Sequence, residues 1–243
     1  MSGKVSRVLP GTRLLDGRID TESQRFSGYG EPYVLPFSSR LAADEGMYFV
    51  GRNATPGTGV AGHAACTTHD TEKAYIMLKN NSAAEGGRRA YLDYIKLRCT
   101  AAGTGGTLDY ATHTIDRGRT YSSGGGDLTL LNVSQQSAVN TVLTTAKIGA
   151  VVPGEANTAV AKIVAHHALR AAVIAVVGDL VIFNFGGPLV TSAGLQEGTL
   201  ELEKVYHCPP VLLGPGDSYH LVIWSGSQSA AKSYECEIGF WER

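Results

Sequence analysis

The chain has 243 residues, of which 43% are hydrophobic and 18% are charged, and its formal net charge is −1. This length fits one large β domain, or one domain with an arm, and the hydrophobic fraction is enough for a packed core. The charged fraction lies below the roughly 25% of an average soluble domain. Because surfaces buried in assemblies are depleted in Lys and Glu, the composition favours an oligomer or a larger particle.

The distribution of charge argues against a nucleic-acid partner. Binding through phosphates needs a local surplus of Lys and Arg. The sequence offers only the pair Arg88–Arg89 and the scattered Arg117 and Arg119. We therefore expect no direct nucleic-acid binding.

The N-terminus and the apolar runs indicate in which cellular compartment the protein is made. The first seven residues lack the apolar core of a signal peptide, and no run approaches the roughly 18 apolar residues of a membrane span. We therefore expect synthesis in a cytosol and no membrane partner. Thiols stay reduced in that compartment. The expectation applies to four cysteines: Cys66, Cys99, Cys208 and Cys236.

Residues 1–45 show no sustained hydrophobic period and contain several Gly and Pro residues. We interpret them as an extended N-terminal arm with one short helix near residues 41–45; a disordered tail is the alternative. A solvated tail has few aromatic residues. This segment carries four, which form a candidate subunit-contact arm: Phe26, Tyr29, Tyr33 and Phe37.

Residues 46–243 read as one β domain. Alternating or continuous apolar runs predict the strands 47–50, 73–79, 89–99, 108–115, 127–133 and 148–152. Loops rich in Gly, Ser and Thr separate them. In the segment 89–99, Asp93 is the one exception on an otherwise apolar face.

The stretch 159–177 is ambiguous. Its alanines favour a helix, whereas its density of Val and Ile favours a buried strand. Gly178-Asp179 looks like a hairpin turn into the apolar run Leu180–Phe185. Because a hairpin needs a strand before its turn, we predict a strand for the part nearest Gly178.

The last forty residues or so carry the clearest pattern. Residues 199–206 alternate, and Pro209-Pro210 ends that strand because proline donates no ladder hydrogen bond. Residues 214–217 form a turn. The segments 218–224 and 233–241 both alternate cleanly, and we predict that they pair as a hairpin.

These elements together define the expected fold class. Alternation of this kind is typical of antiparallel strands, and long crossover helices are missing from the pattern. The sequence therefore predicts an all-β protein, an antiparallel β-sandwich of jelly-roll type with an extended N-terminal arm.

Two short motifs carry possible chemistry. Residues 57–62 match the pattern GxGxxG, but nucleotide binding needs a helix after it, and a flexible loop is the better interpretation. His63, Cys66 and His69 have residue types that suit zinc. A zinc knuckle usually shows a second ligand pair at similar spacing, which is missing, so we assign no metal and leave this site as an alternative.

The remaining candidates give no active site. His166 and His167 are adjacent, and on a strand they point to opposite faces. The pairs Glu201/Glu203 and Glu235/Glu237 are typical of a solvent or subunit face. We expect no catalytic residue, no cofactor and no enzymatic activity.

The segment Cys208–Trp224, followed by Tyr234–Arg243, resembles the end of jelly-roll proteins in tailed-phage virions. The layout of Phe37–Gly46 and Tyr91–Leu97 is also similar. These relatives look like auxiliary capsid proteins, called cement or decoration proteins. The resemblance implies a homotrimer on the capsid exterior that binds the major capsid protein and reinforces the shell.

The sequence is also compatible with two other functions. A phage tail-fibre or receptor-binding module would bind carbohydrate, with Tyr110 or Tyr121 on exposed loops. A hydrolase on a β scaffold ranks last, because it lacks a candidate site.

Overall fold

The computed structural model describes residues 39, 42, 43, 45–104, 109–134, 140–154, 161–170, 175–186 and 203–243. The chain divides into two units at Ser38, and all of these residues belong to the second, Ser39–Arg243. The expected arm residues lie outside the described residues: Phe26, Tyr29, Tyr33 and Phe37. The short helix expected at 41–45 falls partly outside them and stays a prediction.

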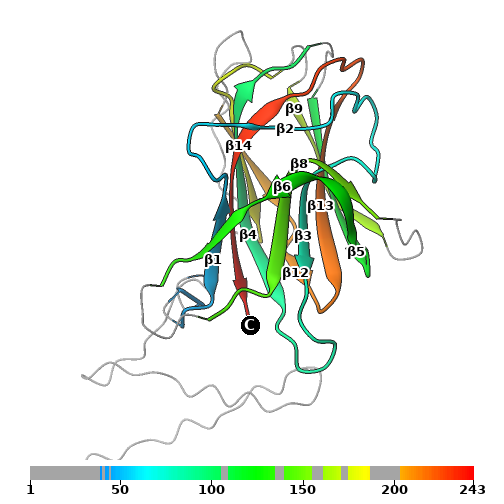
Figure 1. Ribbon diagram of the computed structural model, residues 1–243. Helices are drawn as coiled ribbons and strands as arrows, with labels where there is room; N and C mark the ends of the chain where they lie inside the picture. Colours follow the sequence, from blue (N-terminus) through cyan, green and yellow to red (C-terminus); the bar gives the residue numbers. More distant parts are fainter. Residues whose placement is uncertain are drawn as a thin grey trace, which may run out of the picture. The chain divides into compact units, whose positions relative to one another are not determined.

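The described residues form fourteen strands in two sheets (Figure 1). The eight-stranded sheet has the order β11-β10-β4-β14-β1-β7, with β12 beside β4 and β2 beside β14. Its strands are β1 (Tyr48–Arg52), β2 (Val60–Ala61), β4 (Ala90–Ala101), β7 (Thr129–Asn132), β10 (Leu180–Phe185), β11 (Glu203–Cys208), β12 (Val211–Leu213) and β14 (Ser233–Glu242). Among the strands of the described residues, only β10 and β11 pair in parallel.

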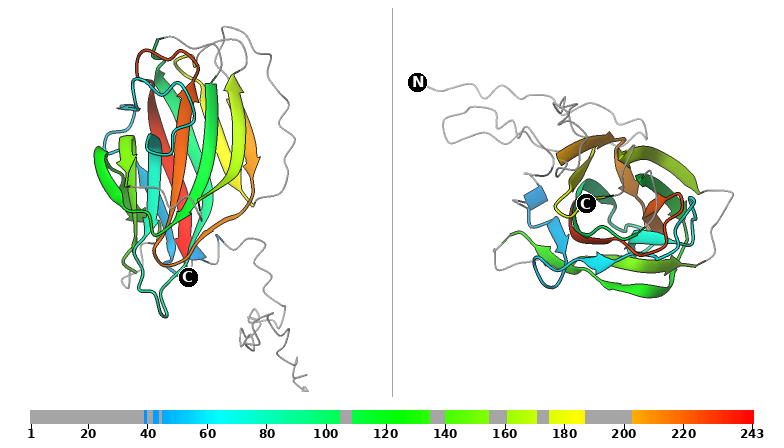
Figure 2. Two further views of the ribbon diagram at one scale, coloured as in Figure 1. Left: turned by 90° about the vertical axis from the view of Figure 1, so that its right-hand side faces the viewer. Right: turned by 90° about the horizontal axis from the view of Figure 1, so that it is seen from above.

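The six-stranded sheet has the order β6-β8-β3-β13-β5-β9 and is antiparallel throughout. Its strands are β3 (Ala74–Asn80), β5 (Asp109–Arg117), β6 (Tyr121–Asp127), β8 (Thr144–Pro153), β9 (Lys162–Arg170) and β13 (Asp217–Ser225). The two sheets face each other (Figure 2). The expected all-β sandwich is thus confirmed, and none of the described residues belongs to a helix able to cross a membrane.

The core lies between the sheets because alternate residues of each strand point inward. One cluster of buried side chains joins both layers, with Phe49, Ile95 and Ile238 from the eight-stranded sheet. Ile76 and Leu221 come from the six-stranded sheet. Each of these five is at most 1% exposed, which marks a core of buried aliphatic and aromatic groups.

The predicted C-terminal hairpin is wrong. β13 lies between β3 and β5 in one sheet, whereas β14 lies between β4 and β1 in the other. The alternation itself is confirmed, since Leu221 and Ile238 are fully buried in the shared core. The strands approach that core from opposite sides. The connection is held by a buried ion pair between Lys232 and Asp109 and by Gln228, whose amide donates to the His63 carbonyl at 2.7 Å.

The hairpin predicted at Gly178-Asp179 is also wrong. The strand β9 ends at Arg170 in the six-stranded sheet, and β10 pairs with β4 and β11 in the other sheet. Ala175 and Val176 belong to no strand. The turn at Gly178-Asp179 is attached to β4 of the eight-stranded sheet. The Cys99 backbone accepts a hydrogen bond from the Gly178 N–H and donates one to the Asp179 carbonyl, both at 2.8 Å. The strand predicted next to Gly178 is therefore not found in the described residues 175–177. The strand of this stretch lies earlier, at Lys162–Arg170, which the sequence left open between helix and strand.

A bulge explains the exception at Asp93. Leu92 lies opposite Phe240 and Tyr94 lies opposite Gly239, so Asp93 is an extra residue in β4. This bulge reverses the phase of the alternation. Asp93 therefore turns outward, where its carboxylate accepts a hydrogen bond from the hydroxyl of Tyr48 at 2.7 Å.

Candidate functional site between the two sheets

The residues expected as zinc ligands in the alternative interpretation do not gather. The Nε2 atom of His63 lies 2.9 Å from the Val151 carbonyl oxygen. The buried thiol of Cys66 donates to the Thr68 carbonyl at 3.7 Å. Within the described part of the chain, the one group of three His, Cys, Asp or Glu side chains close enough to share an ion is a different one, His113, His167 and Cys208.

The adjacent histidines point to opposite faces of the sheet, as expected. The exposed ring of His166 stacks on Tyr110, with 5.2 Å between centroids, and its Nδ1 lies 3.0 Å from the Thr112 hydroxyl. His167 points the other way, between the sheets, where its ring lies 5.8 Å from that of Phe183. The second histidine therefore belongs to the interior.

Three strands bring the cluster together. In the pairing of β5 and β9, Ala111 lies opposite His167, and His113 lies two residues further along the same inward face of β5. Cys208 comes from the opposite sheet, as the last residue of β11, just before Pro209. The Nε2 atoms of His167 and His113 lie 3.4 and 4.0 Å from the Cys208 sulfur, and all three ligand atoms lie within 4.8 Å of one another.

A polar group supports the deepest member of the cluster. His113 is 0% exposed, and its Nδ1 lies 2.6 Å from the hydroxyl of Tyr219, which is also 0% exposed. Tyr219 lies on β13, the strand next to β5. The contact fixes the orientation of the imidazole and leaves Nε2 facing the sulfur.

Aromatic rings form the walls around the three side chains. Phe183 and Phe185 meet the His113 ring edge-on, with centroids 4.5 and 5.7 Å away. Tyr206 covers His167 at 4.8 Å and donates its hydroxyl proton to the Ala168 carbonyl at 2.7 Å. The cluster thus lies in apolar surroundings, where His113 and Cys208 are buried and His167 is half-buried.

Burial keeps the cluster neutral. It lowers the pKa of His113 to about 3, with a smaller effect from His167. Burial also lowers the pKa of His167 and raises the pKa of the Cys208 thiol to about 12. At neutral pH the site therefore holds two neutral imidazoles and a thiol. A thiol with a raised pKa is a poor nucleophile, so burial does not activate Cys208 for covalent chemistry.

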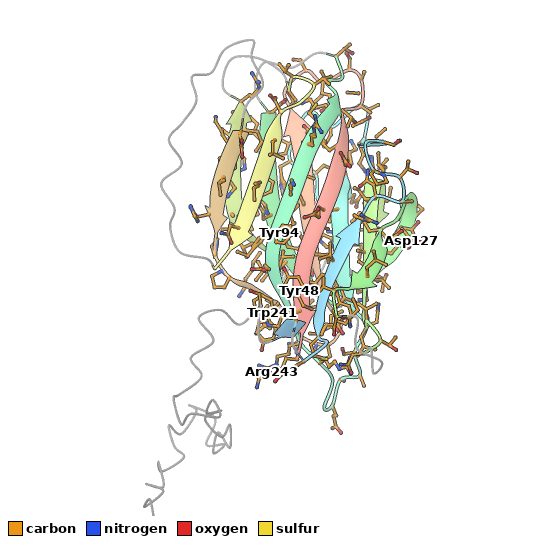
Figure 3. All side chains as sticks on the ribbon, turned by 90° about the vertical axis from the view of Figure 1, so that its left-hand side faces the viewer. Tyr48, Tyr94, Asp127, Trp241 and Arg243 are labelled. Atoms are coloured by element: carbon orange, nitrogen blue, oxygen red, sulfur yellow. The ribbon has the colours of Figure 1, made fainter. Side chains whose placement is uncertain are left out.

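A second feature lies on the outer face of the eight-stranded sheet. Trp241 of β14 lies between Tyr91 and Tyr48 of the two flanking strands, with ring centroids 5.4 and 6.4 Å away. Figure 3 shows Tyr48, Tyr94 and Trp241 on this face. The backbone under them is Gly239, where any Cβ would collide with the ring of Tyr94 and the hydroxyl of Tyr48. We call Tyr48, Tyr91 and Trp241 the outer aromatic stack.

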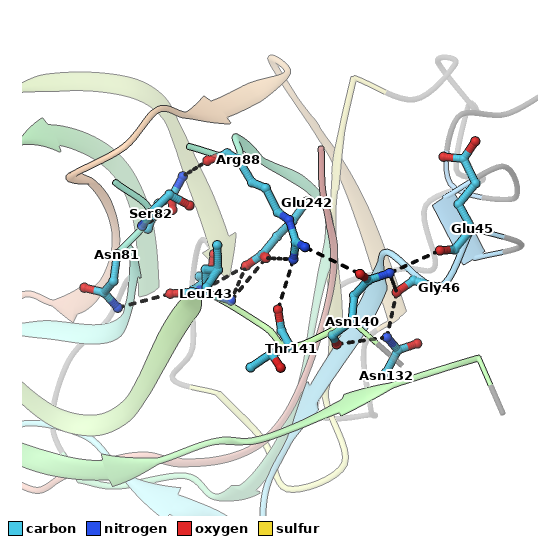
Figure 4. Close-up of polar contacts among 12 residues, drawn as sticks. Glu45, Gly46, Asn81, Ser82, Arg88, Asn132, Asn140, Thr141, Leu143 and Glu242 are labelled. Carbon is cyan, nitrogen blue, oxygen red and sulfur yellow. Dashed lines mark hydrogen bonds and ion pairs between the residues drawn. The ribbon is translucent and has the colours of Figure 1, made fainter. Parts of the chain in front are cut away.

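A network at the end of β14 anchors the chain (Figure 4). The buried carboxylate of Glu242 accepts hydrogen bonds from the backbone N–H groups of Leu143 and Thr144, at 3.0 and 2.7 Å. The guanidinium of Arg88 lies 3.8 Å from that carboxylate and donates to the Thr141 carbonyl at 3.1 Å. These contacts tie the end of β14 to the approach to β8.

The motif at residues 57–62 has the context of a loop and not of a nucleotide site. It ends in the two-residue strand β2, which pairs with β14.

The four cysteines are all free thiols and all buried, as expected for a reduced protein: Cys66, Cys99, Cys208 and Cys236.

Sequence reasoning missed the cluster at His113, His167 and Cys208. Cys208 is 95 residues from His113 and 41 from His167 along the chain, so no local motif contains two of these residues.

Comparison of the chain with protein-family models, with curated proteins and with solved structures found no match.

Proposed function

We propose that the sandwich is a jelly roll. Eight strands support this: β1, β3, β4, β5, β9, β10, β13 and β14. Four of them have the order β10-β4-β14-β1 in one sheet, and the other four have the order β3-β13-β5-β9 in the other. Numbered along the chain, these orders are those of two interleaved Greek keys, which is the arrangement of a jelly roll.

On this fold we propose a structural role in a virion, as a capsid cement or decoration protein. The chain would bind the major capsid protein on the outside of the shell and stabilise it as a homotrimer, without a catalytic step. The C-terminal resemblance and the low charged fraction support this role. In this role, residues 1–45 would form an arm that contacts a neighbouring subunit.

The outer aromatic stack is the observation that carries the assembly part of the proposal. Tyr91 and Trp241 are only half-buried within the chain. Tyrosine and tryptophan are enriched where protein surfaces meet, because they combine a large apolar area with a polar tip. We assign this face to contact with a second copy of the chain.

The alternative, a carbohydrate-binding module, has less support from the same side chains. Sugar binding needs an open aromatic face, and Trp241 has neighbouring rings on both sides. Tyr110 lies on β5 rather than on a loop, and it stacks on Trp224 at 4.4 Å. Tyr121 is 39% exposed, but the ammonium of Lys147 lies over its ring at 4.5 Å.

Light scattering on the full chain, followed by sedimentation with shells of the major capsid protein, tests the proposal. We expect a trimer that sediments with the shells. Tyr91→Arg is expected to shift the trimer toward monomer. Tyr110→Arg is the matched control, since it changes a half-buried tyrosine that stacks on a tryptophan on the other sheet. A strict monomer that does not sediment with the shells, or a protein that binds glycans instead, would contradict the proposal.

A further inference from the structure

We propose that His113, His167 and Cys208 form a binding site for one monovalent copper ion. Two imidazole nitrogens and one sulfur converge there from three strands of two sheets. Soft thiolate ligands select copper(I), and imidazole also binds copper. The site goes beyond the proposed virion role and does not depend on it.

The distances suit a shared ion. Bonds of about 2.3 Å to sulfur and about 2.0 Å to nitrogen place those two atoms about 3.7 Å apart around a trigonal ion. The observed separations between the Cys208 sulfur and the two Nε2 atoms are 3.4 Å for His167 and 4.0 Å for His113. Both sulfur–nitrogen pairs therefore need shifts of only a few tenths of an ångström to share an ion, and the two imidazole nitrogens lie within 4.8 Å of each other.

The hydrogen bond behind His113 supports the same assignment. A histidine that binds a metal usually donates its other ring N–H to a nearby acceptor, which fixes the tautomer. Nδ1 of His113 lies 2.6 Å from the Tyr219 hydroxyl. With the proton on Nδ1 and donated to Tyr219, the lone pair of Nε2 faces the sulfur. Tyr219 is a positioning residue in this site.

Charge favours a monovalent ion. The walls of the site are the rings of Phe183, Phe185 and Tyr206. One thiolate neutralises a single positive charge, whereas a divalent ion would leave a net charge buried in an apolar site at high cost.

Binding of copper(I) exchanges the thiol proton of Cys208 for the metal ion. The sulfur–hydrogen bond of Cys208 breaks, a sulfur–copper bond forms, and the proton leaves to solvent. The two imidazoles donate lone pairs and stay neutral, and no electron is transferred. His167 lies on the edge strand β9 and is half-buried, which gives the ion a path to the site.

Anaerobic titration of the purified full chain with copper(I), against bicinchoninate as a competing chelator, tests the proposal. We expect one equivalent per chain, with sulfur and nitrogen scatterers in X-ray absorption spectra. Cys208→Ser and His167→Gln are each expected to weaken binding more than tenfold. Tyr219→Phe is expected to weaken it about tenfold, the scale of outer-shell changes, while copper keeps the same three ligands in the spectrum.

Cys236→Ser is the matched control, because Cys236 is also a buried free thiol in the same core. Circular dichroism checks that each variant folds, and His167→Gln changes only a half-buried residue at a sheet edge if Cys208→Ser does not fold. Substoichiometric copper in the wild-type chain would overturn the site in favour of a hydrogen-bonded cluster. Equal losses in Cys236→Ser and Cys208→Ser would do the same, and tight Zn²⁺ binding without copper(I) binding would overturn the choice of ion.

Discussion

Arg170 and Asp179 form a buried, two-pronged ion pair at the connection between the two sheets. Nε and Nη2 of the arginine lie 2.7 and 2.6 Å from the two carboxylate oxygens, and both side chains are at most 4% exposed. The same carboxylate accepts the backbone N–H of Val176 at 2.8 Å. The pair therefore fixes the place where the chain leaves β9 for β10.

The first prediction concerns this ion pair. Asp179→Ala leaves the Arg170 guanidinium buried without its carboxylate, and such losses cost about 3–5 kcal/mol. Urea denaturation is expected to show a fall of that size in the free energy of unfolding. The control is Asp127→Ala, which removes the partner of Lys147 at a site where Asp127 is 75% exposed. Its cost is expected to stay below about 1 kcal/mol, and equal losses in the two variants would contradict the prediction.

A side chain at position 239 is expected to destabilise the protein. A methyl group there would collide with the ring of Tyr94 and the hydroxyl of Tyr48, and overpacking of this kind costs about 1–3 kcal/mol. We expect Gly239→Ala to lower the free energy of unfolding by that amount and to disturb the outer aromatic stack. Gly226→Ala is the control, because its methyl group would meet no atom within 4 Å. Near-ultraviolet circular dichroism reports on the rings, and an unchanged spectrum for Gly239→Ala would refute the expected disturbance.

The third prediction concerns Glu242. Glu242→Ala leaves the backbone N–H groups of Leu143 and Thr144 without their acceptor, and each unsatisfied buried donor costs about 1–3 kcal/mol. Hydrogen exchange is expected to accelerate at these two amides while the β13 amides keep their protection. Uniform acceleration through both sheets would mean that the network contributes only to global stability.

Acid sensitivity is the fourth prediction. Burial lowers the pKa of His113 and of His220 from 6.5 to about 3, and the nearby Arg119 and Lys79 lower that of His220 further. Below pH 6.5 the unfolded chain therefore binds protons that the folded chain does not. The sign follows from linkage: the free energy of unfolding is highest above pH 6.5 and falls as the pH drops toward 3.

Denaturation midpoints between pH 7.5 and about 4.5 measure this effect, in the window set by linkage between folded and unfolded pKa values. His220→Gln removes one of the two groups and is expected to reduce the slope of stability against pH over that window. His220 lies on β13 between Met77 and Thr114, away from the His113 cluster. Parallel curves for the variant and the wild-type chain would show that His220 does not contribute.

Local alternation predicted the inner faces of several strands correctly. Leu221, Cys236 and Ile238 are buried as expected, because successive side chains of any strand point to opposite sides. The same rule failed at Asp93, where a bulge adds a residue to β4. It also missed β6, whose glycines and serines carry no apolar signal and which is exposed throughout. Pairing with β8 makes that segment a strand.

The candidate site was beyond sequence reasoning. His167 was correctly separated from His166, because adjacent residues on a strand face opposite ways. Its partners were not predictable, since His113 lies on a neighbouring strand and Cys208 on the opposite sheet. Spacing within a motif therefore carried no information about which ligand atoms meet.

The sequence by itself determined that this chain is an all-β sandwich with a mixed aliphatic and aromatic core. Only the tertiary structure decided that β13 and β14, and likewise β9 and β10, cross between sheets instead of forming hairpins. The physical reason is that alternation is set by the backbone geometry of a single strand. Strand pairing depends on burying both inner faces at once and on contacts such as Arg170 with Asp179, which join residues through the folded core.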